Sequence, residues 1–317
     1  MSGGTGLISL FGLDPQAYEP HPLHAPDRVY RETNCYADVI IELLHARGDE
    51  PLAALGCVVR MDFEGDQWTF FKPWPQDLER LYGIDIHEMQ PYRPLPEQIA
   101  EQLRLGRTLI VELDSWWLPD TAATSYRREH VKTSVAVEAI DIEGRRLRYF
   151  HNAGYFELEG EDYRGAFTPP TLPPYVELVR FDAGPRLTGD ELRRAAREVT
   201  AHHLARRPKA NPVQRFGEAL AAALPALLEG DAEDYHRYAF ATVRMLGSGF
   251  EVGAAHVDWL LGPQGTEASQ AMARIVEGSK LLSLKLARRR AFDPEPIVSG
   301  MAADWELAMT TLDAALA

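Results

Sequence analysis

Residues 126–141 read YRREHVKTSVAVEAID, and this stretch carries the pattern from which we predict the fold. Its charged first part ends at His130, and the run from Val135 to Ile140 is mainly apolar, as in a buried strand. Residues 146–151, which read RLRYFH, form a second strand candidate, and Gly144 between the two suits a tight turn. The sequence therefore predicts a hairpin with a histidine shortly before its first strand.

The rest of the first half alternates between helical and extended patterns. Apolar residues recur at three-to-four spacing from Asn34 to Ala46, which predicts a helix. We therefore predict an α+β domain with an antiparallel sheet over residues 1–184. From residue 188 onward, segments rich in Ala, Leu, Glu and Arg have helical periodicity, which predicts an all-α bundle domain over residues 185–317. The other elements predicted in the first half are strands at 55–63, 67–71, 108–113 and 175–181 and helices at 76–82 and 95–105.

Composition excludes several classes of function. The chain has 317 residues and a net charge of −14, which argues against binding nucleic acid or an anionic membrane surface. We find no signal peptide and no apolar run near the ~20 residues that span a bilayer, and we expect a cytoplasmic protein. Two cysteines make no disulfide framework, and no clustered ligand spacing or nucleotide-binding glycine pattern indicates a metal or a cofactor.

Cys35 is the first candidate for chemistry. It lies in the first turn of the helix predicted from Asn34, where free N–H groups and the helix dipole favour a thiolate. A thiolate at this position is a good nucleophile, and its own N–H can help to bind an oxyanion. The alternative is a small residue of the core, which is the simplest interpretation of the second cysteine, Cys57, in its apolar segment.

His130 is the candidate base for this thiol. Cysteine enzymes need a base near the sulfur and a third group that holds the base in the correct tautomer. The second strand of the hairpin ends in His151 and Asn152, so these residues would lie beside the start of the first strand. Asn152 is our candidate for the orienting role, and His151 remains the alternative.

These motifs resemble a known enzyme family. The order Asp114-Ser-Trp-Trp, His130, an apolar strand and Phe150-His-Asn-Ala-Gly-Tyr is similar to the N-terminal domain of butirosin-type acyltransferases. The resemblance spans about residues 30–160 and implies a papain-like fold. It also implies transfer of an aminoacyl group from a carrier-protein thioester to an amine. The Gln that would supply an oxyanion donor six positions before the nucleophile is absent here, so Asn34 or another donor would have to substitute. In these relatives the histidine directly abuts its strand, where this chain has Thr133.

A second resemblance is closer in sequence. The strings ETNCYADV, EGDQWTFFK, SYRREHVKT and FHNAGYFEL resemble an uncharacterised bacterial family whose members are associated with carrier-protein chemistry. Both resemblances imply an acyl carrier protein with its phosphopantetheine arm as a partner, and the first also implies a small-molecule amine.

Further residues near these motifs are candidate substrate contacts. Arg127 and Arg128 could bind the phosphate of a phosphopantetheine arm, or they could belong to a solvated turn. Trp117 could line a substrate channel or simply pack. Glu32 and Asp114 are candidate contacts for a substrate ammonium group.

The sequence thus supports two hypotheses of different classes. In the first, the chain is a cysteine-dependent acyltransferase, or a hydrolase of amide or thioester bonds, that works through an acyl–Cys35 intermediate. In the second, it is a non-catalytic papain-like scaffold that binds a carrier protein or a synthetase, and Cys35 is merely buried.

Overall fold

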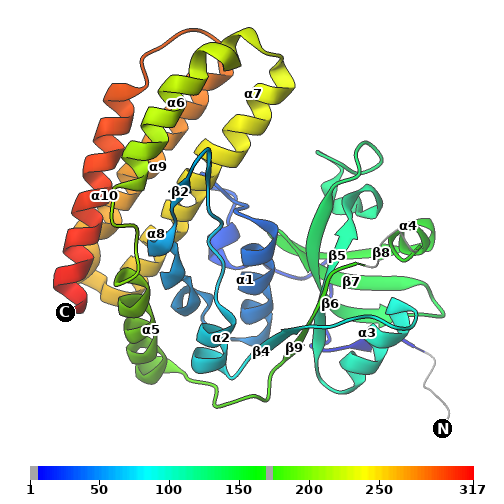
Figure 1. The fold of residues 1–317 in the computed structure, drawn as a ribbon. Helices are drawn as coiled ribbons and strands as arrows, with labels where there is room; N and C mark the ends of the chain where they lie inside the picture. The colour runs from blue at the N-terminus through cyan, green and yellow to red at the C-terminus, as the bar shows by residue number, and fades with distance from the viewer. Residues whose placement is uncertain (1–5, 169–173) are drawn as a thin grey trace. The chain divides into compact units, whose positions relative to one another are not determined.

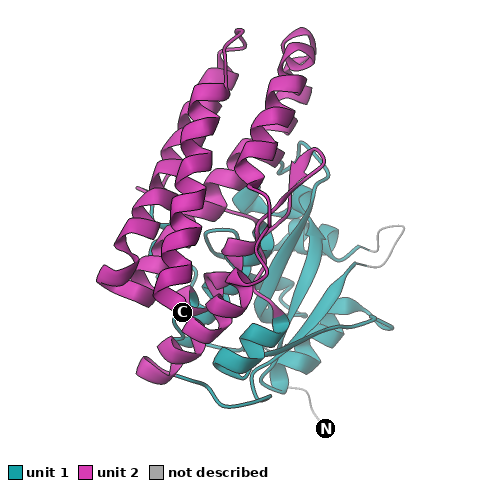
Figure 2. Cartoon of the chain, turned by 60° about the vertical axis from the view of Figure 1, so that its left-hand side comes forward, with its two compact units in different colours: residues 1–25, 35–51, 75–187 teal, residues 26–34, 52–74, 188–317 magenta. Residues whose placement is uncertain are grey.

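The structure, a computed structural model, describes residues 6–168 and 174–317. Its chain forms two compact units, each assembled from separate segments (Figure 2). The sequence-based division at residue 184 assigns everything before it to one domain, whereas by contacts two short early segments belong with the helices. The first unit comprises Met1–Ala25, Cys35–Pro51 and Pro75–Leu187, and the second comprises Pro26–Asn34, Leu52–Trp74 and Thr188–Ala317.

The first unit is built on an antiparallel sheet, to which the described residues contribute seven strands (Figure 1). The order is β4–β9–β5–β6–β7–β8, and β1 pairs with the far end of β6. β6 is the central strand, and every residue from Thr133 to Asp141 is buried. The strands are β1 (Ile8–Ser9), β4 (Asp85–Glu88), β5 (Thr108–Asp114), β6 (Lys132–Asp141), β7 (Arg146–His151), β8 (Gly154–Glu159) and β9 (Val176–Arg180).

Two helices cover opposite faces of this sheet. Val135 and Tyr149 share one hydrophobic core with Ile99 of α3. Because side chains alternate along a strand, Ala136 and Phe150 point to the other face, and α1 packs against β6 and β7. Burial on both faces explains why β6 is an almost continuous apolar run. The helices of this unit are α1 (Cys35–Arg47), α2 (Pro75–Tyr82), α3 (Leu95–Arg104) and α4 (Gly160–Ala166).

α1 carries two fully buried carboxylates, and the ring of one buried histidine contacts both of them. His24 Nδ1 is hydrogen-bonded to Glu42, and its Nε2 lies 3.3 Å from Asp38 Oδ1. Burial alone would lower the pKa of His24, but its hydrogen bonds to Asp38 and Glu42 and their charges outweigh burial and raise it to about 9. His24 is therefore charged at neutral pH, and it ties the segment before α1 to this helix.

The second unit is helical, and α6, α9 and α10 run side by side as long rods (Figure 1). A short hairpin, β2 (Phe63–Glu64) and β3 (Gln67–Trp68), joins it because Phe63 and Trp68 pack around Phe216 of α6. Among the described residues, no helix is both long and apolar enough to cross a membrane. The helices are α5 (Gly189–Leu204), α6 (Pro212–Glu229), α7 (Ala232–Ala239), α8 (Met245–Leu261), α9 (Thr266–Ala287) and α10 (Glu295–Leu316), with a π-helical stretch at Phe240–Arg244.

The strand predicted over residues 55–63 is wrong. Pro51–Arg60 forms a 3₁₀ helix, η2, and only Phe63 and Glu64 are extended there. A short apolar run buried all round does not distinguish helix from strand. Here Gly56 lies so close to α5 that an added Cβ would be 2.4 Å from Thr200 Oγ1, so helical packing decides the conformation.

We expect His24→Gln to destabilise the first unit, because it leaves Asp38 and Glu42 buried without their cation. Breaking a buried ion pair costs about 3–5 kcal/mol, and urea unfolding followed by circular dichroism measures it. Because the pKa of His24 is raised from 6.5 to about 9, its contribution is complete below pH 6.5 and is lost as the pH rises through about 9.

The matched control is His87→Gln, in the same unit, because His87 is paired with Asp85 but its side chain is 74% exposed. Its effect should stay below about 0.5 kcal/mol. Equal effects of the two substitutions, or a His24 effect that does not change with pH, would contradict this assignment.

Candidate active site

Cys35 is the first residue of α1, and its side chain is half-buried. The first turn of this helix is held by Tyr36, whose hydroxyl donates to Glu177 Oε2 at 2.7 Å. Burial, together with the charge of Glu177 and the hydrogen bond to it, raises the pKa of Tyr36, so the phenol stays a donor. Within the described residues Cys35 Sγ makes no hydrogen bond, so the thiol is not paired with His130 in this structure.

His130 is paired with Asp114. Its Nδ1 lies 2.6 Å from Asp114 Oδ2, and its ring stacks on Trp116 with the centroids 4.5 Å apart and the planes 9° from parallel. Since an ionised carboxylate only accepts, Nδ1 carries the proton, and Nε2 of the neutral ring is left as an acceptor. The side chain of His130 is 68% exposed, so this nitrogen is open to a substrate.

The pairing of β5 with β6 explains why these two residues meet. Asp114 ends β5 and is the register partner of Lys132, which begins β6. The backbone N–H of Ser115 also donates to the Val131 carbonyl at 2.9 Å, so a hydrogen bond joins the two ends of the connection between β5 and β6. Asp114 Oδ1 further accepts the backbone N–H of Trp116 at 3.0 Å and so positions the residue on whose indole His130 stacks.

Asn152 and His151 lie elsewhere. Asn152 occupies the turn between β7 and β8 with a φ of 45°, and within the described residues no hydrogen bond joins it to His130. His151 is buried, with Nδ1 2.5 Å from Asp120 Oδ2 and Nε2 2.8 Å from Thr133 Oγ1. By strand alternation His151 faces the α3 side of the sheet, opposite to α1. The group that orients His130 in the structure is thus Asp114, in the position that we expected for Asn152.

Two of the three cations beside His130 already have carboxylate partners. Arg127 donates to Asp162 Oδ1 at 2.6 Å, and its guanidinium lies 4.3 Å over the ring of Trp117. The hydrogen bond to Tyr126 and the nearby carboxylates raise the pKa of Arg127. Lys132 is paired with Glu112, whereas the Arg128 side chain is exposed. This arrangement gives little support to a phosphate site at these residues.

The remaining predicted contacts belong to the second unit. Arg244 of the π-helical stretch donates to the carbonyl oxygens of Glu32, at 2.7 Å, and Thr33, at 3.0 Å. Asn34 Nδ2 donates to the Phe71 carbonyl at 3.1 Å. These hydrogen bonds hold residues 32–34 of the chain, which directly precede Cys35. They do not test the substrate roles of Glu32 and Asn34, which stay predictions.

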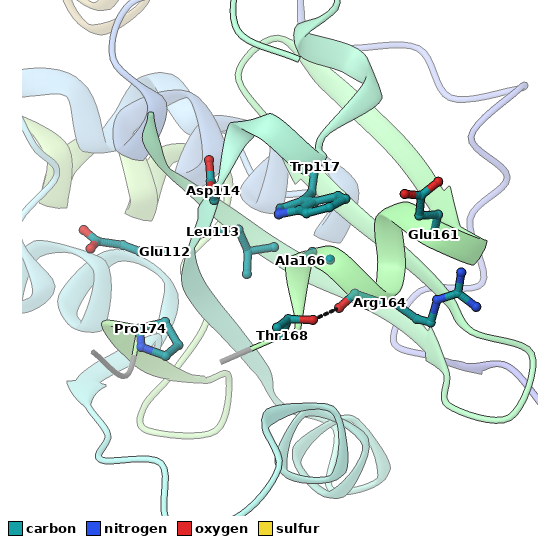
Figure 3. Close-up of a pocket in the computed structure, with 10 residues that line it drawn as sticks. Glu112, Leu113, Asp114, Trp117, Glu161, Arg164, Ala166, Thr168 and Pro174 are labelled. Atoms are coloured by element: carbon teal, nitrogen blue, oxygen red, sulfur yellow. Dashed lines mark hydrogen bonds between the residues drawn. The ribbon is translucent and has the colours of Figure 1, made fainter. Parts of the chain in front are cut away.

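A pocket of about 520 Å³ opens beside Asp114 (Figure 3). Trp117, Leu113 and Ala166 supply its apolar wall, and the charged groups stand at its rim. Gly165 is required here, because an added Cβ would lie 2.1 Å from the indole of Trp117. The lining residues are Glu112, Leu113, Asp114, Trp117, Glu161, Arg164, Gly165, Ala166, Thr168 and Pro174.

The site as described therefore consists of an imidazole oriented by Asp114, which also lines a pocket, and a cysteine at a helix N-terminus in the same unit. The sequence pattern does not reveal the Asp114–His130 pairing, although both residues lie in the connection between two predicted strands. No group of three or more His, Cys, Asp or Glu side chains suited to a metal ion occurs among the described residues.

Two protein-family models together match most of the chain. The model of the DUF1839 N-terminal domain matches residues 19–181, and that of the DUF1839 C-terminal domain matches residues 189–314. A search of the curated proteins found no match to this chain.

The Asp114–His130 contact predicts the tautomer of the imidazole. When the imidazole of His130 is neutral, ¹⁵N NMR of this ring should show a proton on Nδ1 and none on Nε2. Asp114→Ala should shift this population toward the Nε2–H tautomer, which predominates in free histidine. Asp162→Ala is the control, since it releases Arg127 but not His130. An unchanged tautomer in Asp114→Ala would show that the carboxylate does not orient the ring.

Proposed function

This chain belongs to the DUF1839 family, and we propose that its first unit is a papain-like cysteine enzyme that transfers an acyl group. The observation that carries the proposal is the hydrogen bond between Asp114 and His130, which leaves Nε2 of an exposed imidazole ready to take a proton. A carboxylate on Nδ1 and a free Nε2 are what a general base needs beside a nucleophile.

The sheet supports Cys35 as that nucleophile. Leu109 and Val111 of β5 belong to the core on the α3 side, so Ile110 and Asp114 point to the α1 side. Glu177, which holds the first turn of α1 through Tyr36, is the register partner of Ile110. The helix end that bears Cys35 and the carboxylate that orients His130 thus belong to the same face of the sheet.

The proposed reaction has two steps. His130 Nε2 takes the proton of the Cys35 thiol, the sulfur attacks the carbonyl carbon of a thioester, and the proton passes to the departing thiol. An amine then attacks acyl–Cys35, gives its proton to His130 and releases the cysteine thiolate, which is reprotonated. The free N–H groups of the first turn of α1 stabilise the oxyanion in both steps. With water in place of the amine the same groups perform hydrolysis.

The donor that we propose is an acyl or aminoacyl group on a carrier protein, as the resemblance to butirosin-type acyltransferases implies. The pocket beside Asp114 has a size that suits a small molecule, but its apolar wall includes Leu113, which belongs to the core on the α3 side and not to the α1 face that carries Cys35. Glu112 and Glu161 at its rim would favour an ammonium group on the substrate over an anionic one.

One observation favours the second candidate, a non-catalytic scaffold that binds a carrier protein or a synthetase. Cys35 Sγ makes no hydrogen bond within the described residues, whereas catalytic thiols of this type pair with their base. Catalytic hydrogen bonds are often loose without substrate, so a trapping experiment has to decide between the two.

We expect incubation with a panel of acyl and aminoacyl thioesters to add one acyl mass to the intact protein, on the peptide that contains Cys35. Cys35→Ser should abolish this adduct, because serine is a far weaker nucleophile without a strong base. His130→Gln should slow its formation by about 10²–10⁴-fold, as loss of a general base does.

His87→Gln, an exposed histidine of the same unit, is the matched control and should acylate at the wild-type rate. An adduct that persists in Cys35→Ser would overturn the nucleophile. Absence of an adduct with every thioester, in a protein that still binds a carrier protein, would establish the scaffold instead.

A further inference from the structure

A second pocket, of about 390 Å³, lies wholly within the second unit and has a different character. Four cationic side chains line it, and Asp62 is its one carboxylate among the described residues. Asp62 is itself engaged by Arg215, which is not part of the lining. Although the net charge of the chain is −14, this local concentration of positive charge attracts anions.

Arg60, the last residue of η2, is the cation of this lining that most clearly lacks a hydrogen-bond acceptor. Its guanidinium carbon lies 4.3 Å over the ring of Trp74, and its Nη1 is buried without a hydrogen-bond partner. Within the described residues no carboxylate is paired with Arg60. A buried guanidinium nitrogen without an acceptor is costly, so an acceptor that arrives with a ligand would remove this cost.

The other arginines differ in how far they are neutralised. Arg207 forms a bidentate ion pair with Asp313, in which Nη1 lies 3.0 Å from Oδ1 and Nη2 lies 2.6 Å from Oδ2. The pair therefore contributes little net charge to the pocket. Arg206 is held only through Nη1, which contacts His202 at 3.1 Å, and its other two nitrogens have no partner among the described residues. Arg60 and Arg206 are therefore the two guanidinium groups with donors to spare.

Aromatic surface borders the same pocket. Phe70 is 68% exposed and Trp74 is 36% exposed, although both are large apolar rings. The two exposed rings line the same pocket and so form a local apolar patch of the kind found at ligand sites, and a ring face stacks well on a planar heterocycle. Unlike Trp74, which Arg60 covers on one face, Phe70 offers its ring to solvent.

We propose that this pocket binds a nucleoside phosphate. Arg60 and Arg206 donate to the phosphoryl oxygens, in the geometry that guanidinium groups favour for phosphate, and Phe70 stacks on the base. Binding here satisfies Arg60 Nη1 and involves no bond making or breaking. The site is independent of Cys35 and His130, and it is separate from the cations beside His130 that the sequence had indicated.

Isothermal titration of the full chain with AMP and ATP tests the proposal, with inorganic phosphate and pantetheine 4′-phosphate as phosphates that lack an aromatic base. Binding of a nucleotide should weaken by about tenfold or more in Arg60→Gln and in Arg206→Gln. Phe70→Ala should weaken nucleotide binding by about fivefold or more and leave inorganic phosphate unaffected. Arg206 is exposed, so its variant stays informative if Arg60→Gln does not fold.

The matched control is Arg193→Gln, because Arg193 also lies over an indole, that of Trp259 at 4.9 Å, in the same unit but outside the pocket. It should bind nucleotides as the wild type does. No nucleotide binding up to about 1 mM would overturn the proposal. Tighter binding of pantetheine 4′-phosphate than of AMP, with no effect of Phe70→Ala, would overturn the nucleoside assignment.

Discussion

The antiparallel register in which Asp114 pairs with Lys132 fixes both ends of the connection between β5 and β6. It brings a carboxylate at the end of one strand to the histidine just before the next. The same pairing makes β6 the central strand, buried on both faces. Since α1 packs on one of these faces and α3 on the other, a shift of register by one residue would exchange the side chains that face α1 with those that face α3 and dismantle the site as well as the core.

α1 depends on a second constraint, which is ionic. Asp38 and Glu42 are fully buried on this helix, and His24 supplies the charge that makes their burial tolerable. Glu42 lies about two helical turns after Cys35, so the ionic cluster also fixes the rotation of the helix that carries the cysteine. The position of the proposed nucleophile thus rests on residues that take no part in the proposed chemistry.

Local patterns in the sequence were sufficient for several features. The helix that begins at Cys35, the hairpin of β6 and β7 and the helical second half all follow from periodicity and turn residues. Pairings between distant residues were not accessible, because strand alternation does not reveal which loop residue meets which strand end. Asp114 therefore received a substrate role, and Asn152 the orienting role that the structure gives to Asp114. The strand predicted in the apolar run before Arg60 was wrong for a related reason, because packing against α5 decides the conformation of this run.

The central claim is that Cys35 and the Asp114–His130 pair act together. Its most direct test is the rate at which iodoacetamide alkylates Cys35, followed by peptide mass spectrometry across mildly acidic to neutral pH, in wild type, His130→Gln and His87→Gln. If His130 stabilises the thiolate, the His130 variant should react about tenfold more slowly at mildly acidic pH, whereas the His87 variant should match wild type. Identical rates in all three proteins at every pH would contradict the claim.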